Sequence, residues 1–235
     1  MALSVLAGCA APGPQPPDAT TIHATDRSVL MPAGRIVANI AGRGGSPSEA
    51  QSGHALELSF LKGSGSDTQN LGSTQVPIKF GGETFSGPRQ LTHDFKLNWY
   101  ELHYRWRKFL TEGAFGIEGL AGVALPRLDF RVSSSTQQAS ESFGAPGLSL
   151  GAGAIWRFRP ATSVQGRLVY YTGSSDDINR ATRAELYLVQ GLGRNVAVRA
   201  GYVDWSLHVN RQDRANNSDI NLQLSGPSIG LDVLF

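Results

Sequence analysis

Ser149 lies in the segment Gly147-Leu148-Ser149-Leu150-Gly151, which matches the G-x-S-x-G pattern of serine hydrolases. In that chemistry the serine occupies a sharp turn between a strand and a helix, which presents its hydroxyl to a histidine. Here the residues on both sides of Ser149 continue a strand-like alternation without a turn. The pattern is therefore interpreted as part of a strand, and no catalytic residue is assigned.

His103 is the histidine whose neighbours most favour acid–base chemistry. It shares one strand parity with Glu101 and Arg105, so its imidazole could titrate or orient a base. A histidine in such a setting is more commonly one member of a polar core. The sequence contains no H-E-x-x-H segment, no clustered metal ligands and no phosphate loop, and its single cysteine excludes an internal disulfide. We therefore predict neither a metal nor another cofactor.

The element that holds Ser149 is predicted from a regular alternation of residue types. From Leu148 to Phe158 the even positions are apolar, whereas the odd positions include Ser149 and Arg157. This period of two is typical of a β-strand, because successive side chains of a strand point to opposite faces. The same alternation recurs and predicts eight strands, at residues 53–62, 89–107, 112–132, 145–159, 162–173, 181–192, 195–209 and 220–235.

The connections between these strands alternate in length. Tight turns are expected at residues 108–111, 160–161 and 193–194, and long polar loops at residues 63–88, 133–144, 174–180 and 210–219. Short turns on one side, long loops on the other and an even strand number are the plan of outer-membrane barrels. The sequence thus predicts an all-β fold, an eight-stranded antiparallel up-and-down transmembrane β-barrel over residues 53–235. A ten-stranded alternative would add residues 35–41 and 76–85 as strands.

The apolar parity changes at two places along the predicted strands. Apolar residues are odd up to Trp99 and even from Leu102 onward, and a second change lies between Leu224 and Ile229. A β-bulge inserts one residue and flips the register, so a bulge at each place would restore a single apolar face.

Residues 6–9 (Leu-Ala-Gly-Cys) resemble the lipobox of bacterial lipoproteins, in which cleavage precedes a cysteine that becomes diacylated. The resemblance implies lipidation of Cys9. A complete secretory signal needs a basic segment and 7–15 apolar residues, so residues 1–8 are interpreted as a truncated signal remnant. Residues 9–52 are rich in Pro, Ala, Gly, Ser and Thr, and we expect them to form a disordered periplasmic linker.

The last predicted strand ends in Phe235 and resembles the signal that the outer-membrane insertion machinery reads. Over residues 53–235 the chain resembles small outer-membrane β-barrel proteins of bacteria. This resemblance implies a location in the outer membrane with both termini in the periplasm, with membrane lipid and the barrel assembly machinery as partners. Aromatic residues near strand ends on the apolar parity would form its girdles: Tyr104, Trp106, Trp156, Phe158, Tyr170, Tyr202 and Phe235.

Charged residues fall on the parity opposite to the apolar one. An Arg or Lys that faced lipid near the midplane would cost about 2–4 kcal/mol, so these side chains are expected to face inward. The interior of an eight-stranded barrel has room only for packed side chains, which predicts a closed, ion-paired lumen without a pore. The predicted network contains Glu57, Glu101, Arg105, Glu118, Arg157, Arg167, Arg183, Glu185, Arg199 and Asp232.

Composition removes two classes of protein. The sequence has no run of about 18 apolar residues, which excludes a transmembrane helix. Its net charge is only +2 and it lacks a basic stripe, so we expect no nucleic-acid partner.

These observations favour a lipid-anchored outer-membrane barrel with a structural role, or with an interaction role carried by an extracellular loop at residues 63–88. We do not expect an enzyme. The alternatives are a soluble, lipocalin-like lipoprotein that binds an apolar ligand, a narrow solute channel and a lipid-modifying outer-membrane enzyme. The His-x-Ser-Asn segment of outer-membrane deacylases is missing from the sequence.

Overall fold

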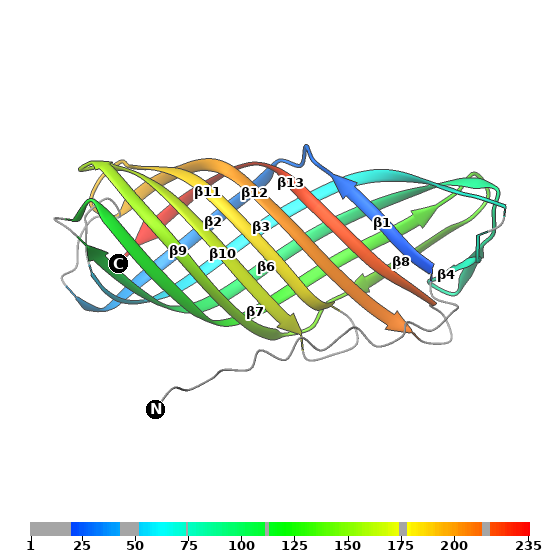
Figure 1. Ribbon diagram of the computed structural model, residues 1–235, viewed down its shortest axis with the longest axis horizontal. Coiled ribbons are helices and arrows are strands. Elements are labelled where there is room, and N and C mark those ends of the chain that lie inside the picture. The colour runs from blue at the N-terminus through cyan, green and yellow to red at the C-terminus, as the bar shows by residue number, and fades with distance from the viewer. Residues whose placement is uncertain (1–19, 43–51, 74, 111–112, 174–177, 213–216) are drawn as a thin grey trace, which may run out of the picture.

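The computed structural model describes residues 20–42, 52–73, 75–110, 113–173, 178–212 and 217–235 (Figure 1). The described chain is all-β, as predicted, and none of its helices is long and apolar enough to cross a membrane. The strands are β1 (Thr20–Asp26), β2 (Met31–Gly42), β3 (Gly53–Leu71), β4 (Ile78–Phe80), β5 (Glu83–Phe85), β6 (Arg89–Leu110), β7 (Phe115–Ser133), β8 (Gln138–Phe143), β9 (Gly147–Arg159), β10 (Thr162–Gly173), β11 (Ile178–Gly191), β12 (Val196–Gln212) and β13 (Asn217–Leu234).

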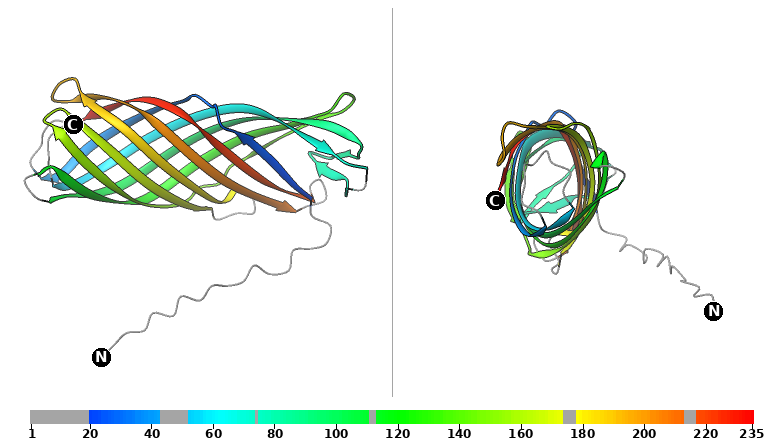
Figure 2. Two further views of the ribbon diagram at one scale, coloured as in Figure 1. Left: turned by 45° about the horizontal axis from the view of Figure 1, so that its top comes forward. Right: turned by 90° about the vertical axis from the view of Figure 1, so that its left-hand side faces the viewer.

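Nine strands form one path of hydrogen-bonded neighbours, in the order β2-β3-β6-β7-β9-β10-β11-β12-β13. Strand β13 also pairs with β2, from Ser228 to Leu234, so the path returns to its first strand. The end-on view in Figure 2 shows these ribbons around an oval outline. Neighbours along the path are antiparallel, whereas β13 and β2 are parallel. Nine strands that alternate in direction begin and end with the same direction, so their closing pair must be parallel.

The prediction of eight strands is therefore wrong. The additional strands β1 and β2 come from residues assigned to the linker at 9–52. Segment 35–41 of the ten-stranded alternative does lie in β2, but segment 76–85 contributes β4 and β5, which form a separate two-stranded sheet. Strand β2 contains Pro32 and Gly34, and its apolar residues do not alternate strictly because Ile36 and Val37 are consecutive, so its composition resembles that of a linker.

The two ends of the described chain lie at opposite ends of the ring. Strand β1 pairs in parallel with the start of β13, where Thr20 is opposite Ser218, and Phe235 follows the other end of β13. The expectation that both termini leave on one side rested on an even strand number, and the nine-stranded path removes that basis. Residues 1–19, and with them the predicted lipidation of Cys9, lie outside the described residues.

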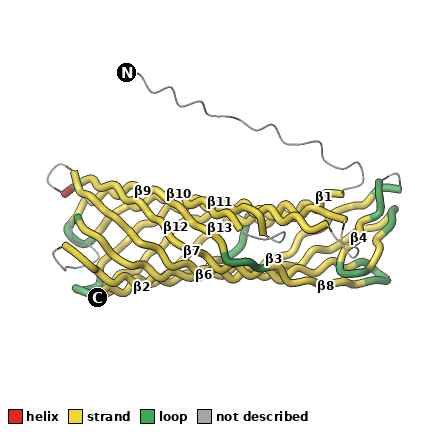
Figure 3. Tube along the Cα trace, turned by 90° about the horizontal axis from the view of Figure 1, so that it is seen from below, coloured by secondary structure: helices red, strands yellow, loops and turns green. Residues whose placement is uncertain are grey.

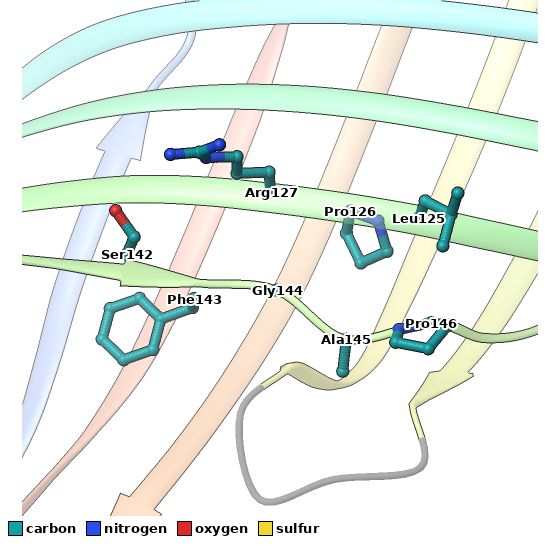
Figure 4. Close-up of a pocket in the computed structure, with 8 residues that line it drawn as sticks. All are labelled: Leu125, Pro126, Arg127, Ser142, Phe143, Gly144, Ala145 and Pro146. Atoms are coloured by element: carbon teal, nitrogen blue, oxygen red, sulfur yellow. The ribbon is translucent and has the colours of Figure 1, made fainter.

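Strands β8 and β9 both pair with β7 and are separated by a kink at Gly144, Ala145 and Pro146. Beside the kink lies a hollow of about 320 Å³ (Figure 4). Its lining consists of Leu125, Pro126, Arg127, Ser142, Phe143, Gly144, Ala145 and Pro146.

Neither predicted bulge is present. The pairing of β6 with β3 and with β7 continues through Trp99 without a register shift, and β12 pairs with β13 continuously past Leu224. As a result Trp99 points inward and is 1% exposed, whereas Leu102 points outward and is 47% exposed. The change of apolar parity is therefore a real change in which side of the sheet is apolar.

This change divides the ring into two zones. In the ion-paired zone, which includes the C-terminal halves of β6 and β13, apolar side chains point outward and polar ones point inward. The outward apolar residues of this zone include Leu56, Leu58, Phe60, Tyr100, Leu102, Tyr104, Trp106, Ile117, Val123, Leu125, Leu150, Trp156, Leu168, Leu186, Tyr202, Ile229 and Leu231.

In the apolar-core zone, at the opposite end, the polarity is reversed. Strands β3, β6 and β8 extend into this zone (Figure 3), and their outward positions carry polar side chains such as Ser66, Gln90 and Asp94. The buried core of the zone includes Ile22, Leu71, Leu91, Phe95, Leu97, Trp99, Leu128, Phe130, Phe143, Tyr171, Trp205, Leu207, Ile220, Leu222 and Leu224.

The hairpin of β4 and β5 lies inside the end of the apolar-core zone, as the end-on view of Figure 2 shows. Its turn is formed by Gly81 and Gly82, which both have positive φ angles, as a two-residue hairpin turn of type I′ requires. Phe80 is 1% exposed and lies 5.7 Å from the ring of Phe130 and 6.2 Å from that of Phe143. Segment 63–88 is thus not the loop that the sequence predicted, because it completes β3 and supplies part of the apolar core.

Candidate functional site: a buried ion-paired interior

The interior of the ion-paired zone collects charged side chains from most strands of the ring. Six arginines and five carboxylates are buried there. They alternate with the outward apolar residues because inward and outward side chains alternate along every strand. The set consists of Arg35 on β2, Glu57 on β3, Glu101, Arg105 and Arg107 on β6, Glu118 on β7, Arg167 on β10, Arg183 and Glu185 on β11, Arg199 on β12 and Asp232 on β13.

Glu57 is the hub of the network. The Arg167 guanidinium donates to both carboxylate oxygens of Glu57, and its Nη2 is 3.1 Å from Glu57 Oε2. Arg105 Nη1 donates to Glu57 Oε2 at 3.1 Å, and Arg35 Nη1 lies 3.8 Å from Oε1. One carboxylate thus holds arginines from three other strands, which ties distant parts of the ring together.

The network continues from Glu57 in two directions. Arg167 also donates through Nε to Glu118, which accepts a second bond from Arg107 at 2.8 Å. On the other side Arg35 pairs with Asp232. Arg199 Nε lies 3.4 Å from Asp232 Oδ1, so charges of opposite sign alternate without a break from Arg107 to Arg199.

A second cluster surrounds Glu101 at the border with the apolar-core zone. Arg183 Nη2 donates to Glu101 Oε2 at 2.6 Å, and Trp99 Nε1 donates to Oε1 at 2.7 Å. Arg183 also pairs with Glu185 at 2.8 Å and lies over the ring of Trp205, 4.9 Å from its centroid. This cluster links the charged interior of the ion-paired zone to the aromatic side chains of the apolar-core zone.

Two glycines make room for this packing. A Cβ atom at Gly153, which is opposite Glu118, would lie 2.9 Å from the Glu118 side chain. A Cβ atom at Gly230, which is opposite Arg199, would lie 2.9 Å from Arg199 Nε. A larger residue at either position would have to displace a buried charged side chain. The charged side chains therefore pack directly against the backbone at these two glycines.

Ser149, His103 and Glu101 come together in the order of a serine–histidine–acid arrangement. Ser149 Oγ lies 2.9 Å from His103 Nε2, but His103 Nδ1 is 3.9 Å from Glu101 Oε2, which is too long for a hydrogen bond. Ser149 is fully buried, and it lies in the regular strand β9 as the sequence predicts. The geometry fits a hydrogen-bonded polar core better than a nucleophile that a substrate could reach.

The structure buries every member of the predicted network except Arg157, which is only half-buried. It adds Arg35, which lay in the predicted linker, and Arg107, the last residue of the predicted strand at 89–107, which the predicted network did not include. Arg107 shares the parity of Arg105, so parity was a usable signal there, whereas Arg35 required the recognition of β2. Among the described residues, no group of His, Cys, Asp or Glu could hold a metal ion.

Phe235, the predicted insertion signal, is 72% exposed, and its backbone is tied to β2. Its N–H donates to the Val37 carbonyl at 2.9 Å, and its carbonyl accepts from the Asn39 N–H at 3.1 Å. Its role as a signal stays a prediction.

Comparisons with known proteins give no relative for this chain: no protein-family profile, no curated protein and no solved structure matches it.

Proposed function

We propose that this protein is an integral β-barrel of the bacterial outer membrane. Its ion-paired zone would span the bilayer as a closed barrel without a pore. Its apolar-core zone would lie outside the cell and provide a structural or interacting surface. The observation that carries the proposal is the combination of outward apolar and inward charged side chains in one zone. A soluble protein would have the opposite arrangement, which is found only in the other zone.

The height of the apolar band supports this proposal. On β7 the outward positions from Phe115 to Leu125 carry only apolar side chains or glycine. This stretch of eleven residues matches the roughly 9–11 residues that a tilted strand needs to cross the hydrocarbon core. Strand β6 has 22 residues, about twice that length, so much of it must lie beyond the bilayer.

The filled interior favours a structural barrel over a solute channel or a carrier of apolar ligands. In the ion-paired zone the space is occupied by paired charges, and in the apolar-core zone the β4–β5 hairpin and aromatic side chains occupy it. An apolar ligand would meet charged residues in the first zone and a packed core in the second. We therefore expect near-zero conductance in planar bilayers, and discrete ion currents would argue for a channel.

Orientation follows from the connections. The tight turn between β9 and β10 lies at the end that Phe235 occupies, and outer-membrane barrels keep short turns in the periplasm. The long connections between β3 and β6 and between β7 and β9, which contain β4, β5 and β8, lie at the other end, so the apolar-core zone would face the exterior.

The test uses membrane fractions washed with urea and electrophoresis with and without boiling. An integral barrel stays in the pellet and migrates faster when it is not boiled, whereas extraction by urea without a mobility shift would overturn the proposal.

Two variants on the same face of β6 provide a matched pair. Leu102→Arg places a charge in the apolar band and should lower the free energy of unfolding in vesicles by about 2–4 kcal/mol. Gln90→Arg lies on the polar exterior and should leave it unchanged.

A further inference from the structure

The outward face of β3, β6 and β7 becomes basic directly beyond the apolar band. The last apolar row across these strands is Phe60, Tyr100 and Leu125, which are paired neighbours. The next row in the same registers is Lys62, Asn98 and Arg127.

Two further rows of polar side chains follow, and they extend onto β8. The first contains Ser64, Lys96, Asp129 and Ser142, and the second contains Ser66, Asp94, Arg131 and Ser140. On the opposite side of the ring, the outward row of Thr182, Ser206 and Gln223 carries no charge, and the rows on either side of it contain one acid, Asp204, and one base, Arg180. The basic face is therefore local to one sector and is not a girdle around the whole ring.

The cations of this face are available to a ligand. Within the part of the chain that the structure describes, Lys62, Lys96 and Arg131 form no ion pair. Arg127 has a partner in Asp129 at 3.5 Å, but the two side chains are 67% and 40% exposed. A pair this exposed contributes little, so an incoming anion can compete for the guanidinium.

A hollow of about 650 Å³ lies on the same face and includes both polar rows. It offers serine hydroxyls and carboxylates beside two of the cations, which are the groups that bind sugar hydroxyls. Its lining consists of Ser64, Gly65, Ser66, Asp94, Phe95, Lys96, Asp129, Phe130, Arg131, Ser140, Glu141 and Ser142.

We propose that this face binds a phosphorylated glycolipid of the outer leaflet. The acyl chains would lie on the row of Phe60, Tyr100 and Leu125, and the phosphates would bind Lys62, Lys96 and Arg127. The sugar would occupy the hollow beyond them. The three parts of such a lipid follow one another in the same order as the apolar, basic and hydroxyl-rich rows. The inference rests on the proposed membrane function, because only a membrane would place the acyl chains against the apolar band.

The phosphate contact has a clear physical basis. Arg and Lys form charge-assisted hydrogen bonds with phosphate that are roughly twice as strong as neutral ones. A plain phospholipid would satisfy the basic row but would leave the hollow without a sugar. Discrimination between the two lipids is therefore the property that identifies the site.

The experiment measures lipid retention by native mass spectrometry of the folded full-length protein in neutral detergent. The probes are a bisphosphorylated, acylated glucosamine disaccharide (lipid A) and phosphatidylglycerol, which has a phosphate but no sugar ring. The test variant combines Lys62→Gln, Lys96→Gln and Arg127→Gln. The control variant combines Lys108→Gln, Arg159→Gln and Arg194→Gln, which removes the same charge from exposed positions at the other end of the ring.

We expect the wild type and the control variant to retain the disaccharide lipid, and the test variant to bind it about tenfold more weakly or worse. Equal retention of phosphatidylglycerol, equal loss in both variants, or no retention by the wild type would each overturn the proposal. The heat-dependent mobility shift is recorded on the same samples. If the wild type lacks the shift, the membrane proposal fails, and if it has the shift without lipid retention, only the glycolipid site fails.

Discussion

The ion-paired zone and the apolar-core zone are built from the same strands, yet they have opposite polarity. On β6, Leu97 and Trp99 are buried and Lys96 is exposed, whereas a few residues later Glu101 and His103 are buried and Leu102 is exposed. The backbone register does not change between them. What changes is which side of the sheet carries the apolar side chains.

This difference shows that one strand can reverse the polarity of its two faces along its length. If the ion-paired zone lies in a membrane, as proposed above, lipid surrounds its outward apolar side chains and its inward charges must pair with one another. In the apolar-core zone the outward side chains are polar and the inward ones pack as in the core of a soluble protein. The border lies at the Trp99–Glu101 contact, where an indole N–H donates to a carboxylate and links the two kinds of interior.

The largest effect is expected from Glu57→Gln in the ion-paired zone. The change leaves Arg35, Arg105 and Arg167 without their shared carboxylate in a buried setting. Breaking a buried ion pair in this way costs about 3–5 kcal/mol. Urea unfolding in lipid vesicles should show this loss, and a change below about 1 kcal/mol would mean that water reaches the interior.

Phe130→Ala should have a similar effect in the apolar-core zone, for a different reason. Phe130 is 1% exposed and contacts Phe80 and His93, so its removal leaves a cavity that costs about 3–5 kcal/mol. Its neighbour Arg131 points outward, and Arg131→Ala should change stability by only about 0.5 kcal/mol. Equal losses from the two variants would contradict the assignment of inner and outer faces.

Acid should weaken the apolar-core zone through His93. This side chain is fully buried and neither ring nitrogen has a hydrogen-bond partner among the described residues. Burial lowers its pKa from 6.5 to about 4, although Asp67 and Asp94 oppose the shift. Because the unfolded chain binds the proton more readily, stability is complete above about pH 6.5 and falls by about 3 kcal/mol as the pH approaches 4. His93→Leu should remove this part of the pH dependence, and an unchanged profile in that variant would exclude His93 as its source.

The smallest effect is expected at the exposed pair of Arg127 and Asp129. A double-mutant cycle with Arg127→Gln and Asp129→Asn should give a coupling energy below about 1 kcal/mol. The same cycle with Arg167→Gln and Glu57→Gln should give a clearly larger value, because that pair is buried. Similar coupling energies for the two pairs would contradict the assignment of Arg127 and Asp129 to an exposed outer face and of Arg167 and Glu57 to a buried interior.

Much of the strand pattern could be predicted from the sequence. The strand at Thr162–Gly173 was predicted with its observed bounds, and the other seven predicted strands overlap β3, β6, β7, β9, β11, β12 and β13. Strands β1 and β2 were missed because their residues resemble a linker in composition, whereas two other failures have a common cause. The two expected bulges assumed that one face must be apolar along its whole length, whereas the outer face here passes from apolar to polar. The interpretation of segment 63–88 as a loop failed for the same reason, since polar residues on the outward parity of the strand were taken for a polar loop.

The sequence by itself determined which side chains share a face, because the alternation of a strand is a local property that the backbone imposes. It also determined that Glu57, Arg167 and their partners belong to the face opposite the apolar one. Only the tertiary structure decided which face points inward in each zone, how many strands close the ring, and which charges meet. Those outcomes depend on pairing between residues far apart in the chain, such as Arg167 with Glu57 across 110 positions, and no local pattern encodes such a contact.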